Sequence, residues 1–332
     1  MGLTTPPRLK NIVTKSVEVK TGPICQGQHC KGLKDLRVGS RNVLLLYQSG
    51  TLKMLLSQLD SYKMDITAIQ EIRWTGEGII EKKNRTIFYS CDRKHHMFGT
   101  GFIVKWRIKH LVTDFKAKTP RICKIHVRGL FFNYSLICVH APTEEKDDDE
   151  KDNFYEDLDQ IYEECPKRDV KIIIGNLNAK IGQEAIYRPI IIKYSLHTLS
   201  NDNGIRLINF ACSKNIVVAS TLFNHKDIHK MTWRSHDGQT HNQIDHLLID
   251  ARHVSNLMDV RTFRGANIET GHYYLLISKI RSGISNARKM YGSYARIFNS
   301  EKMKSSETSS AYREKLNEYL AKHVDNDDIN EV

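Results

Sequence analysis

Three consecutive isoleucines, Ile172–Ile174, are followed at once by Gly175, and this stretch constrains the fold more than any other part of the sequence. A run this apolar predicts a strand that is buried on both faces. Asn176 and Asn178 follow the strand, and their i, i+2 spacing predicts that both side chains point to the same face. Ligands of open α/β sheets bind outside the carboxyl ends of the strands. This strand end is therefore a candidate site, although it offers two amides where hydrolytic chemistry would need a carboxylate.

Strand and helix patterns alternate along both halves of the chain. Apolar runs predict strands at residues 43–46, 66–69, 172–174 and 216–219, and helical spacing of apolar residues predicts helices within residues 52–65, 144–165 and 201–215. We expect residues 231–235 and 242–250 to pair as a hairpin, and residues 272–280 to form the last strand. This alternation predicts an α/β fold in which two sheets are covered by helices.

The chain is expected to have three parts. Residues 1–35 show no clear period and should form a poorly ordered N-terminal extension. Residues 36–282 should form the folded domain. Residues 283–332 are predicted to be a basic connector that contains one helix, formed by the amphipathic stretch at residues 310–324.

Composition narrows the class of partner and the compartment. The net charge of +12 favours a polyanionic partner such as nucleic acid, the plain alternative being a merely basic protein. The sequence contains no run of eighteen apolar residues, so we expect no membrane-spanning helix. The first twenty residues lack the apolar segment of a secretory signal. Seven scattered cysteines, with Cys123 and Cys138 expected as buried thiols, are typical of a reducing compartment. We therefore expect an intracellular protein, nuclear or cytoplasmic, that is not secreted. Its oligomeric state stays open.

Polar side chains recur at the ends of the predicted strands: Asn42, Glu71, His140, Asn176, Asn178, Asp245 and His272. Each has an ordinary explanation by itself, because an asparagine often forms a turn and a glutamate or histidine is often only solvated. Their repetition at corresponding strand ends predicts that they converge on one cleft.

Six stretches in this order resemble the endonuclease/exonuclease/phosphatase superfamily: DITAIQEIRWTGEG, HAPTEEKDDDEKDNFYEDL, IIIGNLNAKIG, SNDNGIRLINFA, MTWRSHDGQTHNQIDHLLID and RGANIETGHYYLL. More narrowly, residues 36–280 resemble the endonuclease domain of non-LTR retrotransposons and the craniofacial development protein 2-like proteins. The resemblance implies a four-layer α/β sandwich and a magnesium-dependent phosphodiesterase that acts on DNA. Residues 283–325 resemble the connector that leads in full elements to a reverse transcriptase, a domain that we do not expect in this chain.

The same resemblance assigns roles to individual residues. It implies that Glu71 binds the metal ion and that Asn42 lies beside the metal and the phosphate; a hard cation prefers such oxygen ligands. It implies that Asn178 contacts the scissile phosphate and that Asp245 orients His272, the catalytic histidine. The remaining position, His140, stands where many members have a phosphate-contacting tyrosine.

Two departures from the family pattern predict a damaged site. Asn176 replaces an aspartate that is thought to activate the attacking water, and Gly271 replaces a second aspartate near the metal and the histidine. One positioned acid or base is worth about 10²–10⁴ in rate, and Mg²⁺ should bind weakly when few carboxylates remain. We therefore predict an endonuclease-like domain with impaired catalysis. The alternatives are a non-catalytic nucleic-acid-binding protein or decayed remnant and, less favoured by the basic charge, a phosphatase of the same superfamily.

Overall fold

The computed structural model describes residues 35–44, 46, 50–235, 237–265 and 274–281, together with five helical residues, Ser310, 313–315 and Asn317. The chain divides into two units, residues 1–285 and residues 286–332. The five helical residues belong to the second unit and lie within the stretch that the sequence predicts as a helix. The fold described below is that of the first unit.

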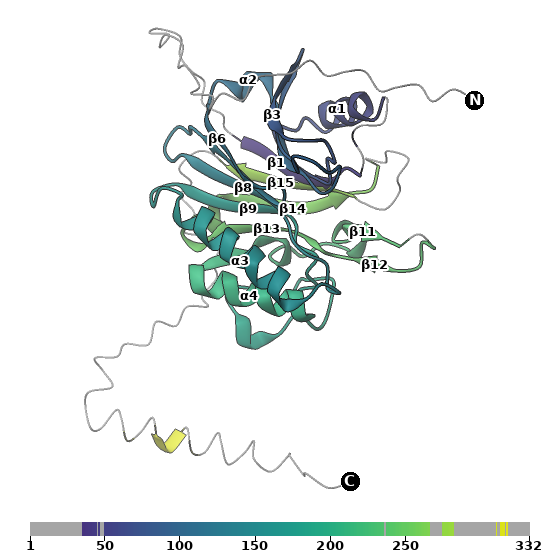
Figure 1. Cartoon of the computed structure of the whole chain (residues 1–332). Helices are drawn as coiled ribbons and strands as arrows, with labels where there is room; N and C mark the ends of the chain where they lie inside the picture. Colours follow the sequence, from purple (N-terminus) through teal and green to yellow (C-terminus); the bar gives the residue numbers. More distant parts are fainter. Residues whose placement is uncertain are drawn as a thin grey trace. The chain divides into compact units, whose positions relative to one another are not determined.

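Two large sheets form the centre of the first unit (Figure 1). The seven-stranded sheet has the order β14-β15-β1-β2-β5-β4-β3, with strands Leu257–Phe263, Leu275–Arg281, Asp35–Asn42, Ile66–Gln70, Thr100–Lys105, Arg85–Ser90 and Glu77–Lys82. The six-stranded sheet has the order β10-β13-β9-β8-β7-β6, with strands Ile216–Val218, Asp245–Asp250, Val170–Asn176, Tyr134–His140, Ile122–Val127 and Val112–Thr119. Both sheets mix parallel and antiparallel pairs, since β1–β2 and β8–β9 are parallel.

The two sheets pack face to face and are covered by helices on their outer faces. Val38, Phe102 and Leu136 belong to the buried cluster between the sheets. Helices α3 (Asp148–Glu163) and α4 (Asp202–Lys214) pack on the outer face of the six-stranded sheet, and α1 (Thr51–Ser61) packs on the outer face of the other sheet. The predicted four-layer α/β sandwich is therefore confirmed.

Local sequence explains where α3 and α4 begin. Asp147 precedes α3 and its carboxylate accepts a hydrogen bond from the backbone N–H of Glu150, while Asn201 caps α4 through the N–H of Gly204. Side-chain acceptors at this position satisfy N–H groups that have no partner within the helix. The acidic first turn of α3 also suits the positive end of the helix dipole. Both helices thus have strong start signals in the sequence.

Several short elements complete the unit. They are α2 (Trp106–Lys109), the 3₁₀ helices η1 (Ala185–Tyr187), η2 (Ala219–Thr221), η3 (Asp227–His229) and η4 (Ala251–Asn256), and the two-stranded hairpin of β11 (Trp233–Arg234) and β12 (His241–Asn242). Among the described residues, no helix has the length and apolar character needed to cross a membrane. Cys123 and Cys138 are fully buried, as the sequence predicts.

The expected pairing of residues 231–235 with residues 242–250 is only partly right. Trp233 pairs with Asn242, but the strand that follows, β13, starts at Asp245 and joins β9 and β10 in the large sheet. The Thr232 hydroxyl accepts hydrogen bonds from the N–H groups of Ile244 and Asp245 and so separates the two segments. The apolar residues of β13 are all buried in the sandwich, which explains why this strand leaves the hairpin.

Candidate active site

Strand registers bring most of the predicted site residues to one end of the two sheets. Asn42 ends β1 opposite Gln70 at the end of β2. His140, Asn176 and Asp245 are neighbours across β8, β9 and β13. His272 and Gly271 lie outside the described residues.

Glu71 is the acidic centre of this strand end. Its Oε1 accepts a hydrogen bond from Asn42 Nδ2 at 2.7 Å, and its Oε2 accepts one from the Arg73 guanidinium at 2.8 Å. Both Glu71 and Arg73 have a φ of 56°, in the left-handed region that residues with a Cβ rarely adopt. This backbone returns the Arg73 side chain to Glu71, so that a cation of the protein itself neutralises the carboxylate.

His140 lies beside this ion pair as a neutral imidazole. Its Nε2 is 3.8 Å from Glu71 Oε1, and its Nδ1 has no hydrogen-bond partner among the described residues. Burial lowers the pKa of His140 to about 4; the charge of Glu71 opposes this effect, and the charges of Arg121 and Arg73 add to it. At neutral pH His140 can therefore hydrogen-bond a phosphate oxygen only through an N–H of the neutral ring.

A second arginine is held against the same histidine. The guanidinium of Arg121 lies 3.9 Å from the centroid of the Phe98 ring. The Phe98 and His140 rings pack edge to face, with their centroids 6.2 Å apart. Arg121 also donates to the backbone carbonyl of His140 at 3.2 Å and to Glu150 at 2.6 Å. Arg73 and Arg121 thus place two guanidinium groups, both of which hydrogen-bond to a carboxylate, around His140.

Asn176 and Asn178 bind each other and the neighbouring loop. Oδ1 of Asn176 accepts from the backbone N–H of Asn178 at 3.0 Å, and Nδ2 of Asn178 donates to the carbonyl of Ala141 at 2.8 Å. The preceding Gly175 is required by space, because a Cβ there would lie 2.0 Å from the carbonyl oxygen of Val139. The amides of this strand end therefore hold the loop that follows it.

Asp245 is a buried carboxyl group. It is 2% exposed, and neither carboxylate oxygen has a hydrogen-bond partner within the described ranges. Burial raises the pKa of Asp245 to about 7; the nearby Thr232 hydroxyl opposes this effect, and the negative charge of Glu71 adds to it. The backbone N–H groups of both Asp245 and Tyr274 donate to Thr232, at 3.1 and 2.9 Å, so the described chain resumes close to Asp245 two residues after His272.

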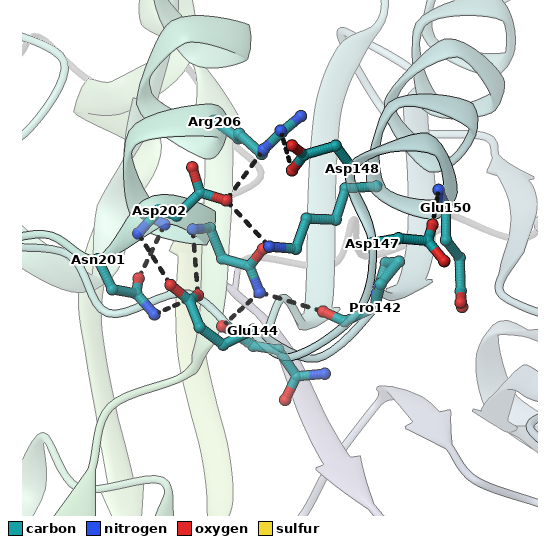
Figure 2. A network of polar contacts seen from close by, with 12 residues as sticks. Pro142, Glu144, Asp147, Asp148, Glu150, Asn201, Asp202 and Arg206 are labelled. Atoms are coloured by element: carbon teal, nitrogen blue, oxygen red, sulfur yellow. Dashed lines mark hydrogen bonds and ion pairs between the residues drawn. The ribbon is translucent and has the colours of Figure 1, made fainter.

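A polar network joins the loop at Pro142 and Glu144 to the start of α4 at Asn201 and Asp202 (Figure 2). The side chain of Asn203 donates to the carbonyls of Pro142 and Asn178, at 3.2 and 3.0 Å. Glu144 accepts from Asn201 and from the first backbone N–H groups of α4. The Oδ2 atom of Asp202 accepts hydrogen bonds from Lys151 and Arg206, at 3.0 and 3.1 Å.

The described residues do not fit a magnesium site as they are arranged. Among them, no group of three or more histidine, cysteine, aspartate or glutamate side chains is placed to hold a metal ion. Mg²⁺ takes near-octahedral oxygen ligands, including one or two carboxylates. Here both oxygens of Glu71 already accept hydrogen bonds, and Asn42 presents its amide nitrogen to Glu71. No metal-dependent step is therefore derived from this geometry.

Comparison with solved structures shows that several DNA-processing enzymes share this fold. The endonuclease domain of TRAS1, a telomere-specific non-LTR retrotransposon, matches with a TM-score of 0.50 and 13% identity over 75% of this chain and 99% of that domain. The AP endonuclease LMAP from Leishmania major matches with a TM-score of 0.57 and 11% identity over 75% and 88% of the two chains. The 3' phosphatase NExo from Neisseria, bound to a product DNA hairpin, matches with a TM-score of 0.54 and 16% identity over 74% and 99%. At these identities the likeness shows a nuclease-like fold.

By sequence, the chain is a relative of craniofacial development protein 2. It is 33% identical to that protein of Tragulus javanicus and 32% identical to that of Bos taurus, each over 257 residues and 77% of this chain. The chain spans 43% and 42% of these relatives, less than half of their length. No family model matches the chain. The resemblance that the six ordered motifs predict is confirmed.

Sequence reasoning missed three residues of the site: Arg73, Arg121 and Asn203. Arg73 stands two positions after Glu71, but its contact depends on two left-handed backbone conformations that the sequence does not show. The aromatic partner of Arg121, Phe98, lies 23 residues before it in the chain. Asn203 follows the capping Asn201 in SNDNG, and this capping motif was the one available indication that a neighbouring amide had a structural role.

Proposed function

We propose that this chain is a DNA-binding domain with a nuclease fold that hydrolyses phosphodiester bonds very slowly or not at all. The observation that carries the proposal is the amide side chain of Asn176 and its hydrogen bond. Its side-chain oxygen accepts the N–H of Asn178, and an amide has no carboxylate with which to accept a proton from water. A general base is normally worth about 10²–10⁴ in rate, so its loss alone leaves a poor nuclease.

The charges at the strand end support the same proposal. Glu71 is paired with Arg73, and burial raises the pKa of Asp245 to about 7, which disfavours its ionised form. A nuclease of this superfamily would need these carboxylates to hold Mg²⁺ and to orient His272. We propose that Mg²⁺ binds weakly here, because Glu71 and Asn42, the residues that would hold it, already bond to each other and Glu71 also bonds to Arg73, and that Asp245 is the partner of His272.

DNA is the partner that the comparisons favour. The solved neighbours include a retrotransposon endonuclease domain, an AP endonuclease and a phosphatase bound to a DNA hairpin. The chain has a net charge of +12, and phosphate contacts dominate the affinity of basic proteins for DNA. We propose that Arg73, Arg121, Asn178 and neutral His140 contact the phosphate backbone, and that the protein works inside the cell, where DNA is available.

Binding and nicking by one protein preparation test the proposal. Duplex affinity is measured by fluorescence anisotropy with a chelator, and conversion of supercoiled plasmid to nicked circles is measured with Mg²⁺ and with Mn²⁺. We expect the affinity for duplex DNA to be independent of metal and to be weakened by Arg121→Gln. We expect the rate of plasmid nicking to be no higher than that of a Glu71→Gln variant. Nicking that clearly exceeds the Glu71→Gln level would show an active nuclease. Release of phosphate from 3'-phosphorylated DNA without nicking would favour the phosphatase alternative.

A further inference from the structure

The strand ends opposite the candidate active site carry exposed aromatic residues. Strand registers place the end of β5, the start of β8 and the end of β13 at this opposite end. Trp106 follows β5 directly and is 60% exposed. Phe131 and Phe132, in the turn between β7 and β8, are 51% and 45% exposed, beside Leu130. Large apolar side chains gathered in this way mark an interaction site more often than isolated ones do.

Hydrogen bonds and a ring contact join the segments at this end into one surface. The N–H of Arg128 donates to the carbonyl of Leu111, just beyond α2, at 2.7 Å. The Phe132 ring meets the ring of His253 at 5.0 Å, and Arg252, beside His253, donates to the carbonyl of Lys167 at 3.1 Å. The distal surface, as we name it, consists of Trp106, Arg107, Arg128, residues 130–132, Lys167 and Arg168.

The cations of the distal surface form no salt bridge among the described residues, although the hydrogen bond from Lys214 and, to a lesser degree, the charge of Lys167 lower the pKa of Glu163. The side chains of Arg107, Arg128, Lys167 and Arg168 are exposed, and none forms an ion pair within the part of the chain that the structure describes. Their basic neighbours differ, since Lys109 pairs with Glu81 and Arg252 with Asp250. The distal surface therefore combines three exposed aromatic rings with four exposed cations that form no salt bridge among the described residues.

We propose that the distal surface binds single-stranded nucleic acid. Exposed aromatic rings stack on bases, and cations beside them contact the phosphates of the same strand. A duplex hides the faces of its bases, so the rings favour an unpaired strand over the duplex expected at the other end of the sheets. A purely apolar partner would gain nothing from four cations that form no salt bridge in the described part of the chain. The positive charge of the surface therefore favours a polyanionic partner. The proposal is independent of whether the candidate active site hydrolyses DNA.

The test uses the full chain and a fluorescent single-stranded oligothymidylate. Affinity is measured by anisotropy, with an excess of unlabelled duplex present to occupy the other end. Trp106→Ala and Phe131→Ala should each weaken binding about tenfold, and Lys167→Gln with Arg168→Gln should reduce its salt dependence. Ile186→Ala and Lys226→Gln replace an exposed apolar residue and an exposed lysine elsewhere and serve as matched controls.

Tryptophan fluorescence adds a readout that is specific for the position of binding. The sequence has three tryptophans, and Trp74 and Trp233 are half-buried. Stacking of a base on Trp106 should quench the emission, and Trp106→Phe should abolish the quenching while it keeps most of the affinity.

Two results would overturn the proposal. One is equal affinity of the distal-surface variants and the controls for oligothymidylate. The other is concentration-dependent dimerisation in sedimentation velocity that Phe131→Ala abolishes while the oligonucleotide neither binds nor competes, because the surface would then bind a second copy of the chain.

Discussion

Replacing Asp245 by asparagine should stabilise the protein at neutral and alkaline pH and leave its stability almost unchanged near pH 4. Asp245 is fully buried, and its pKa is raised from the ordinary value of 3.8 to about 7. Because the folded protein holds this proton more tightly than the unfolded chain does, the contribution of Asp245 to stability is fully present below pH 3.8. It is lost as the pH rises through about 7.

The size of the effect follows from the two pKa values. A tenfold change in proton affinity is worth about 1.4 kcal/mol, so a rise from 3.8 to about 7 costs the ionised protein about 4 kcal/mol. Asparagine keeps the shape of the side chain and carries no charge to desolvate. The stability gained by Asp245→Asn should therefore be about 3 kcal/mol larger at pH 8 than at pH 5.

Urea unfolding at pH 5, 6, 7 and 8, followed by circular dichroism, measures this difference. Asp250, at the other end of the same strand, provides the control. Burial works against its ionisation, but hydrogen bonds from Arg252 outweigh this and lower the pKa of Asp250, so Asp250→Asn should destabilise the protein at neutral pH. A pH-independent difference between Asp245→Asn and the unmodified protein would refute the reasoning, because the folded-state pKa of Asp245 would then be ordinary.

Three further predictions concern the fold and the partner. Chelation with EDTA should leave the thermal melting temperature unchanged, because the sandwich core is separate from the strand end at Glu71; a large drop in differential scanning fluorimetry would contradict this. Affinity for duplex DNA, measured by anisotropy, should fall steeply between low and physiological salt, and an affinity insensitive to salt would be contrary to the proposed phosphate contacts. Gly175→Ala should destabilise the protein by at least about 3 kcal/mol in urea unfolding, because the new Cβ would lie 2.0 Å from the carbonyl oxygen of Val139; a neutral effect would mean that β8 and β9 can separate freely.

The central strands and the two outer helices could be predicted because their patterns are local. The isoleucine run of β9 and the capped, amphipathic α3 and α4 each contain the information for their own structure. The strands β3, β4, β6 and β14 were missed, and the strand predicted at residues 43–46 was wrong, because β1 ends at Asn42. β3 and β6 lie at the edges of the sheets and carry exposed charged residues such as Glu81 and Lys116, as edge strands often do, and such residues hide the apolar alternation.

The residues of the candidate site could be predicted more readily than their ionisation states. Polar residues at the strand ends identify Asn42, Glu71 and His140, and the structure brings these three together. The low pKa of His140 depends on how completely the surrounding loops bury it, and the neutralisation of Glu71 depends on the left-handed backbone at Arg73. Both are tertiary properties that no local pattern records.

Plasmid nicking by the unmodified protein beside its Asn176→Asp, Gly271→Asp and doubly substituted forms tests the central claim most directly. Groups that act as a unit are not additive, so each single change should recover little nicking and the double change much more. The recovered activity should need Mg²⁺ and should vanish when Glu71→Ala or His272→Ala is added. If the unmodified protein already nicks DNA as fast as the double variant, positions 176 and 271 are not where catalysis was lost.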